Sequence, residues 1–114
     1  MRTLITIPDK ILEPYLKNKE FIMASDEGEA VAIAAGVYLA TNKRALVVIS
    51  ADGFCNALNP LTSYVMPEKI EMDFIISVGR QEPPHEVMSN CLEQIINLLN
   101  YDKQRISFTF LRKE

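Results

Sequence analysis

Two carboxylates, Glu27 and Glu29, stand where an apolar run of the sequence gives way to a helix with almost no polar face. Residues 24–30 read ASDEGEA, and small apolar residues follow as far as Ala40. A carboxyl group held in a cleft at such a junction can share a proton with a nitrogen of a bound ligand. The same pattern also fits a structural role, in which Asp26 caps the helix and both glutamates complement its dipole. Local sequence leaves both interpretations of Glu27 open.

A second group of candidates lies in residues 50–60, which read SADGFCNALNP. Gly53 would let the backbone approach a ligand closely, and Asn56 falls at the start of the following helix. The stretch lacks the lysine and the full glycine pattern of a phosphate-binding loop. A tight strand-to-helix turn is therefore the alternative interpretation.

Residues 79–85, GRQEPPH, form a predicted loop that carries both signs of charge and the single histidine of the chain. Arg80 could hold an anionic substrate through its planar guanidinium. His85 could transfer a proton near neutral pH. The alternative is a solvated loop, stiffened by its two prolines, that takes no part in chemistry.

Strands and helices must alternate regularly to position these residues. Strand-like apolar runs cover residues 3–7, 21–24, 45–49, 72–78 and 106–111, and helical segments cover 10–17, 26–40, 56–65 and 86–99. This alternation predicts an α/β fold of three layers, α/β/α, with a mostly parallel sheet of about five strands. Because the carboxyl ends of parallel strands share one edge of a sheet, the candidate residues should gather at that edge.

The composition indicates one compact domain, 1–114, and excludes several classes of function. The 114 residues are 48% hydrophobic, which is enough apolar material for a single core. A net charge of −3 with dispersed basic residues argues against nucleic-acid binding. No apolar run approaches the roughly 20 residues of a membrane span, and the first residues lack a secretory layout. Cys55 and Cys91 have no CxxC spacing, so we expect a cytoplasmic protein without a disulfide framework or zinc site.

The helix predicted over residues 26–40 is apolar almost all round, as in a fully buried helix. Gly36 in its interior costs about 1 kcal/mol relative to alanine, which is easiest to understand if another element packs very close. A chain of this size offers little to bury a helix on every side. We therefore predict that part of this helix meets another subunit, with a central helix inside one domain as the alternative.

Three stretches resemble the pyrimidine-binding (PYR) domain of thiamine diphosphate enzymes. Residues 24–41, ASDEGEAVAIAAGVYLAT, are similar to the segment that carries the essential glutamate of that family. Residues 53–63, GFCNALNPLTS, resemble its glycine-containing loop and the next helix, and residues 79–83 resemble its loop after the fourth strand. The resemblance looks closest to phosphonopyruvate decarboxylase and to the alpha subunit of sulfopyruvate decarboxylase, and it extends over residues 3–85.

The resemblance implies a PYR-type fold and a subunit of a carboxy-lyase that removes carbon dioxide from a small 2-oxo acid. Glu27 matches the catalytic glutamate that hydrogen-bonds the N1′ nitrogen of the aminopyrimidine and thereby activates thiamine diphosphate. The implied cofactor-binding residues are Glu27, Gly53, Phe54 and Asn56, and the implied substrate-binding residues are Arg80 and His85. No metal ligand is assigned to this chain.

The same family binds its diphosphate and metal through a Gly-Asp-Gly and Asn pattern in a second domain, and these residues lack that pattern. The resemblance therefore implies a partner, a PP-domain (beta) subunit that holds Mg²⁺, in a homodimerising or heterotetrameric assembly. This chain would then be an alpha subunit that is inactive alone. Two alternatives stay open, namely a non-catalytic PYR-like scaffold or regulatory subunit, and a flavodoxin-like domain that binds a nucleotide or flavin.

Overall fold

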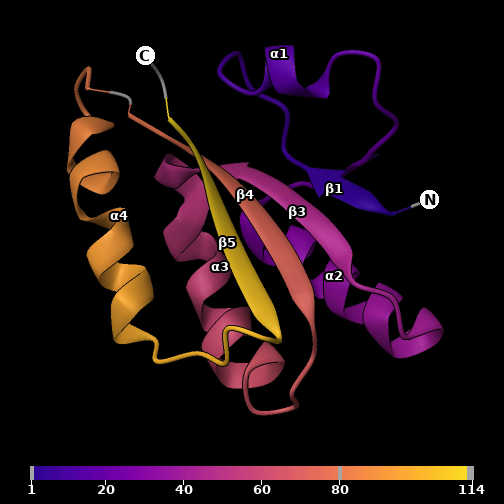
Figure 1. Cartoon of the computed structure of the whole chain (residues 1–114). Helices are drawn as coiled ribbons and strands as arrows, with labels where there is room; N and C mark the ends of the chain where they lie inside the picture. The colour runs from indigo at the N-terminus through magenta and orange to yellow at the C-terminus, as the bar shows by residue number, and fades with distance from the viewer. Residues whose placement is uncertain (1, 80, 113–114) are drawn as a thin grey trace.

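The computed structural model describes residues 2–79 and 81–112, and in this part of the chain all strands join one parallel sheet (Figure 1). In chain order the strands are β1 (Leu4–Thr6), β2 (Ile22–Met23), β3 (Ala45–Ser50), β4 (Met72–Val78) and β5 (Ile106–Arg112). Their order in space is β2-β1-β3-β4-β5, and every neighbouring pair is parallel. This arrangement confirms the α/β fold with a five-stranded parallel sheet that the alternating pattern predicts.

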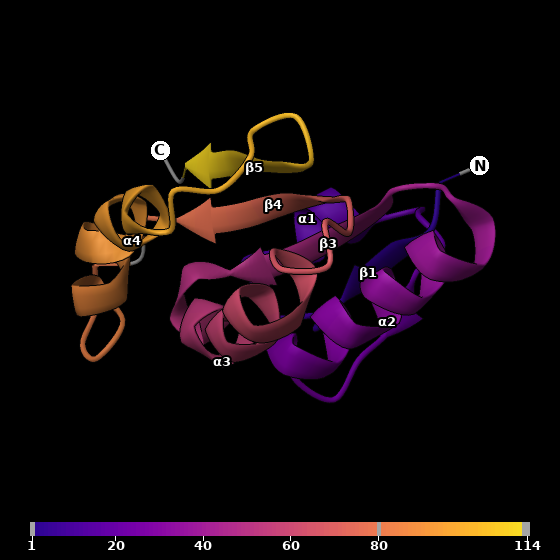
Figure 2. The ribbon, with the colours of Figure 1, turned by 90° about the horizontal axis from the view of Figure 1, so that it is seen from below.

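Helices flank the sheet on both faces, but unequally. They are α1 (Glu13–Leu16), α2 (Glu27–Thr41), α3 (Phe54–Pro60) and α4 (Glu86–Leu98), with a 3₁₀ turn η1 (Ala51–Gly53) before α3 and a π turn η2 (Leu61–Val65) after it. Because parallel crossovers are right-handed, α1 lies on one face, and α2, α3 and α4 lie on the other. Figure 2 shows α2 and α3 side by side beneath the sheet. The layer that α1 forms is therefore thin.

Several element boundaries differ from the predicted ones for local reasons. The helix predicted over residues 10–17 is reduced to the single turn of α1, because Asp9 accepts a hydrogen bond from the Leu12 N–H at 3.0 Å and holds a separate turn. The helix predicted over residues 56–65 begins earlier, at Phe54, and takes π geometry after Pro60. Pro60 has no N–H to continue the α-helical pattern, which accounts for the irregularity.

Two apolar clusters hold these layers together. The larger cluster lies under α2, α3 and α4 and includes the fully buried strand residues Val47, Ile49, Phe74 and Ile76. The smaller cluster lies under α1 and contains Leu4, Leu12, Leu16, Leu46 and Val48. Close packing on both faces of β3 makes the central strand rigid, so the loop at its carboxyl end has a fixed position.

One face of α2 is buried and the opposite face is exposed. The buried face consists of Ala30, Val31, Ala34 and Ala35. On the other face Leu39 is 62% exposed, and a Cβ added to Gly36 would meet no atom within 4 Å. The alternative of a helix enclosed within one domain is therefore wrong. Contact of this apolar face with another subunit stays a prediction.

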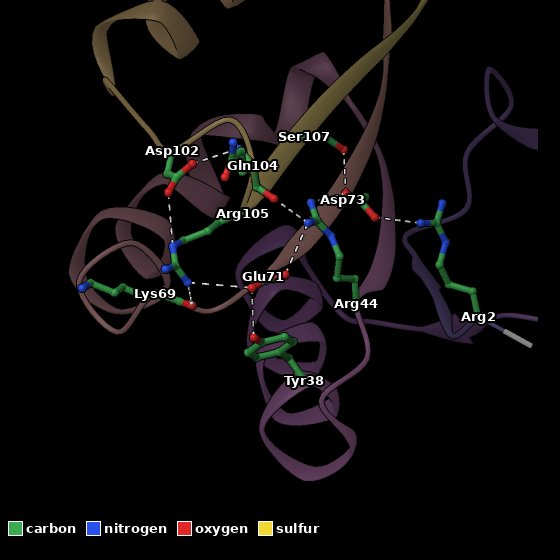
Figure 3. Close-up of polar contacts among 10 residues, drawn as sticks. All are labelled: Arg2, Tyr38, Arg44, Lys69, Glu71, Asp73, Asp102, Gln104, Arg105 and Ser107. Carbon is green, nitrogen blue, oxygen red and sulfur yellow. Dashed lines mark hydrogen bonds and ion pairs between the residues drawn. The ribbon is translucent and has the colours of Figure 1, made fainter.

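A charged network ties the strands together at their amino ends (Figure 3). Arg44, just before β3, donates to the Asp73 carboxylate in β4 at 2.6 Å and to the carbonyl of Gln104 at 2.7 Å. Asp73 also accepts hydrogen bonds from Arg2 and Ser107, each at 2.7 Å. Burial alone would raise the pKa of Asp73, but the hydrogen bonds from Ser107 and Arg44 and the charges of Arg44 and Arg2 lower it below its ordinary value. The network therefore lies at the edge of the sheet opposite to the one at which the candidate site residues are predicted.

Candidate functional site

The carboxylate of Glu27, the first residue of α2, lies against the backbone of Gly53. A Cβ added to Gly53 would stand 1.9 Å from Oε2 and 2.7 Å from Oε1 of Glu27. Asn56 donates a hydrogen bond from Nδ2 to Oε1 of Glu27 at 2.9 Å. The junctions after β2 and β3 thus bring three of the predicted site residues together at the carboxyl edge of the sheet.

The neighbouring acids, Asp26 and Glu29, use their carboxylates to close the start of α2. Asp26 accepts from the Glu29 N–H at 2.8 Å, and Glu29 accepts from the Ser25 N–H at 2.8 Å. This reciprocal arrangement resembles a capping box and satisfies N–H groups that a helix start leaves unpaired. The structural interpretation of the segment therefore holds for Asp26 and Glu29. The Glu27 carboxylate extends instead to Gly53 and Asn56.

Glycine is needed at position 53 because a side chain would have no room there, and not because of the backbone conformation. Its φ of −95° and ψ of 0° are open to any residue. No side chain fits there, however, because the Glu27 carboxylate already fills the position of a Cβ. Gly28 has a similar role that sequence reasoning missed, since a Cβ there would lie 3.1 Å from the Asn56 carbonyl oxygen. A glycine in the first turn of a helix was the available signal for it.

The Glu27 carboxyl is only partly covered by the chain itself. Glu27 is half-buried and Asn56 is exposed, so the group that they form reaches the surface. Gly53 beneath it is buried. The arrangement can hold a proton donor or acceptor at a fixed place while one side stays open to a ligand.

Phe54 takes a different position from its predicted partners. Its side chain is fully buried and meets the Phe108 ring edge-on, with 6.0 Å between the ring centroids. This residue anchors the start of α3 in the core. Any contact of Phe54 with a ligand is therefore left to its backbone.

His85 is held by an acid that sequence reasoning did not assign to the site. Its Nδ1 lies 2.9 Å from Oδ2 of Asp52, which belongs to η1 beside Gly53. The contact brings the loop before α4 against the loop after β3 and leaves Nε2 of His85 as the other ring nitrogen available for chemistry. Arg80, the second predicted substrate-binding residue, lies outside the described residues.

The described residues contain neither a cluster of metal ligands nor a membrane-spanning helix. In residues 2–79 and 81–112, no cluster of three or more His, Cys, Asp or Glu side chains could hold a metal ion. Within the same ranges, no helix has the length and apolar character needed to cross a membrane.

Comparison with known proteins identifies the fold. The sequence matches no protein-family model and no curated protein. Among solved structures, benzoylformate decarboxylase from Polynucleobacter necessarius superposes with a TM-score of 0.71 at 19% sequence identity. The match covers 98% of this chain and 27% of that chain, so this chain spans about a quarter of the decarboxylase. The fold predicted from the resemblance is therefore the fold of part of a decarboxylase.

Proposed function

We propose that this chain is the PYR-domain (alpha) subunit of a thiamine diphosphate-dependent 2-oxo acid decarboxylase. The observation that carries the proposal is the Glu27 carboxylate, which rests on Gly53 and is hydrogen-bonded by Asn56. These are the positions where the sequence resembles the cofactor site of such enzymes. The superposition on benzoylformate decarboxylase, whose name denotes removal of carbon dioxide from a 2-oxo acid, supports the same class of reaction.

The residues present fit the aminopyrimidine end of the cofactor. Gly53 provides a place without a side chain, Asn56 orients one oxygen of the Glu27 carboxylate, and the surface beside Glu27 stays open. When bound, thiamine diphosphate supplies an electron sink for the breaking bond to the carboxylate carbon. The task of Glu27 is to exchange a proton with a ring nitrogen, and that of Asn56 and Gly53 is to hold the carboxylate in place.

The residues for the substrate end are His85 and Arg80. His85 is oriented by Asp52 at 2.9 Å, next to the loop that supports Glu27. In this proposal Nε2 of His85 faces the acid group of a small 2-oxo acid, with the guanidinium of Arg80 as a second contact. A phosphonopyruvate or sulfopyruvate type of substrate is the finer part of the proposal and rests on the sequence resemblance.

The proposal includes a partner, a PP-domain (beta) subunit that holds the diphosphate and Mg²⁺. Exposed apolar side chains near Glu27 support it. At the edge of the sheet, Ile22 and Met23 of β2 are 43% and 68% exposed, and Phe21 just before them is 37% exposed. An exposed apolar surface beside a half-buried carboxylate is expected where a second subunit completes the site.

Calorimetry on an assembled complex tests the proposal. The chain is co-expressed with a candidate PP-domain subunit, purified as a complex, and titrated with thiamine diphosphate in the presence of Mg²⁺. Uptake of the cofactor by the complex, followed by turnover of phosphonopyruvate, sulfopyruvate or benzoylformate, supports the decarboxylase. A complex that forms but takes up no cofactor favours the scaffold or regulatory subunit instead. Binding of a flavin or nucleotide by the isolated chain favours the flavodoxin-like alternative.

A further inference from the structure

The contact between Asp52 and His85 determines which nitrogen of the His85 ring keeps a hydrogen. Oδ2 of Asp52 lies 2.9 Å from Nδ1 of His85, and the two side chains are 23% and 29% exposed. An ionised carboxylate only accepts hydrogen bonds, so Nδ1 is the donor of this bond and carries a hydrogen. Nδ1 therefore keeps its hydrogen in the charged and in the neutral form of the ring. Nε2 is then the nitrogen that gains and loses the proton.

Contacts on both sides of His85 along the chain hold the ring in this position. The His85 backbone N–H donates to the carbonyl of Glu82 at 2.8 Å. Three residues further on, Sδ of Met88 in α4 lies 3.8 Å from Sγ of Cys55 in α3. The beginning of α4 is therefore attached both to η1 and to α3, which limits how far the ring can turn away from Asp52.

The charged and titratable groups around the ring do not favour the opposite arrangement. Within residues 2–79 and 81–112 they are the carboxylates of Asp52 in η1, of Glu82 in the loop and of Glu86 at the start of α4, and the thiol of Cys55. The carboxylates cannot donate a hydrogen bond to Nδ1 when they are ionised, and the thiol is directed to Met88. None of these groups would move the hydrogen from Nδ1 to Nε2.

We propose that Asp52 is a positioning residue that makes Nε2 of His85 a pH-dependent contact for the substrate. The inference rests on the proposed function, in which Nε2 faces the acid group of a 2-oxo acid. When the ring is charged, Nε2 carries a hydrogen and donates it to the anionic substrate. When the ring becomes neutral, the Nε2–H bond breaks, the proton goes to water, and a lone pair faces the acid group. His85 therefore binds the substrate only in its charged form.

NMR of the whole chain labelled with ¹⁵N tests the assignment, because His85 is the single histidine and its ring signals stand alone. At about pH 9, where an ordinary histidine is neutral, we expect the hydrogen on Nδ1. Asp52→Ala should change the ratio of the two tautomers by about tenfold or more in favour of Nε2–H, the form that free histidine prefers. The matched control Asp102→Ala, in the turn before β5, removes an acid at the opposite edge of the sheet and should leave the ring signals unchanged.

The wild-type spectrum decides the tautomer without any variant. A hydrogen mainly on Nε2 in the neutral wild-type ring would overturn the inference. Equal tautomer ratios in the wild type and Asp52→Ala would overturn it as well, and so would an equal change in Asp102→Ala.

The pH dependence of KM in the assembled two-subunit complex tests the consequence for the substrate. With the wild-type chain, KM should rise by up to about tenfold per pH unit above the titration of His85, with a smaller change in kcat. In Asp52→Ala the neutral ring keeps a hydrogen on Nε2, so the rise in KM should be flatter. Equal pH profiles of KM would overturn the role of Asp52. A complex that takes up no cofactor contradicts the proposed decarboxylase instead, and the ring measurement on the free chain still decides the tautomer.

Discussion

The contact between Gly53 and Glu27 predicts that the effect of Gly53→Ala on stability depends on whether Glu27 is present. In the wild-type chain, Gly53→Ala would place a Cβ 1.9 Å from Oε2 of Glu27, so the carboxylate has to move. Because this carboxylate is the end of a flexible, half-buried side chain, it can turn aside, and the main cost is the lost hydrogen bond with Asn56, about 0.5–1.5 kcal/mol of folding free energy. We therefore expect Gly53→Ala to shift the Glu27 carboxylate away from Asn56 and to lose in this way the stability that alanine would otherwise add.

In a Glu27→Ala background the obstacle is gone, and the same substitution should become favourable. Gly53 has a φ of −95°, which alanine adopts without strain. Replacement of glycine at such a position stabilises a protein by about 0.4–1 kcal/mol through the unfolded state. The difference between the two backgrounds is the coupling energy of the double-mutant cycle, and it should equal the cost of displacing the Glu27 carboxylate, about 0.5–1.5 kcal/mol.

Urea denaturation of the four variants measures this coupling, since a chain of this size should unfold in one cooperative step. Gly36→Ala is the matched control. Gly36 lies in the interior of α2 with open space where its Cβ would be, so alanine should stabilise the chain by about 1 kcal/mol. An unchanged effect of Gly53→Ala in both backgrounds would refute the contact on which the proposed site depends.

Two further predictions concern stability. Asp26→Ala removes the side-chain cap of α2 and should cost about 1 kcal/mol in denaturation experiments, whereas a neutral effect would contradict the assigned cap. Asp73 has a lowered pKa, so its contribution to stability is complete above its ordinary pKa of about 4 and is lost as the pH falls through the lowered value. Asp73→Asn should therefore lose less stability than the wild type between about pH 4 and pH 2 in acid-denaturation curves, and parallel curves would contradict the network.

The sequence predicted the fold well, because the strongest signals came from long apolar strands. The run at residues 72–78 coincides with β4, and the parallel arrangement followed from continuous rather than alternating apolar residues. Predictions failed where one local contact decides a boundary. The turn that Asp9 holds shortens α1, and the missing N–H of Pro60 turns the end of α3 into η2. A pattern of apolar residues does not reveal local contacts of this kind.

The candidate site was predictable in its residues but not in all of their contacts. Topology alone brings the junctions after β2 and β3 to one edge, so Glu27, Gly53 and Asn56 could be placed together from sequence. The contact between Asp52 and His85 joins loops that lie 33 residues apart in the chain, and nothing in the sequence links the two. The burial of Phe54 likewise depends on the Phe108 ring, which β5 brings against it.

The central claim is that the Glu27 carboxyl exchanges a proton with the cofactor, and turnover of a 2-oxo acid by the assembled two-subunit complex tests it most directly. Glu27→Gln keeps the size of the side chain and an oxygen that Asn56 can reach, but it removes the exchangeable acid. The account predicts that the variant complex assembles normally and that its kcat falls by about 10²–10⁴-fold, the usual contribution of a positioned acid or base. A kcat close to that of the wild type would contradict the account.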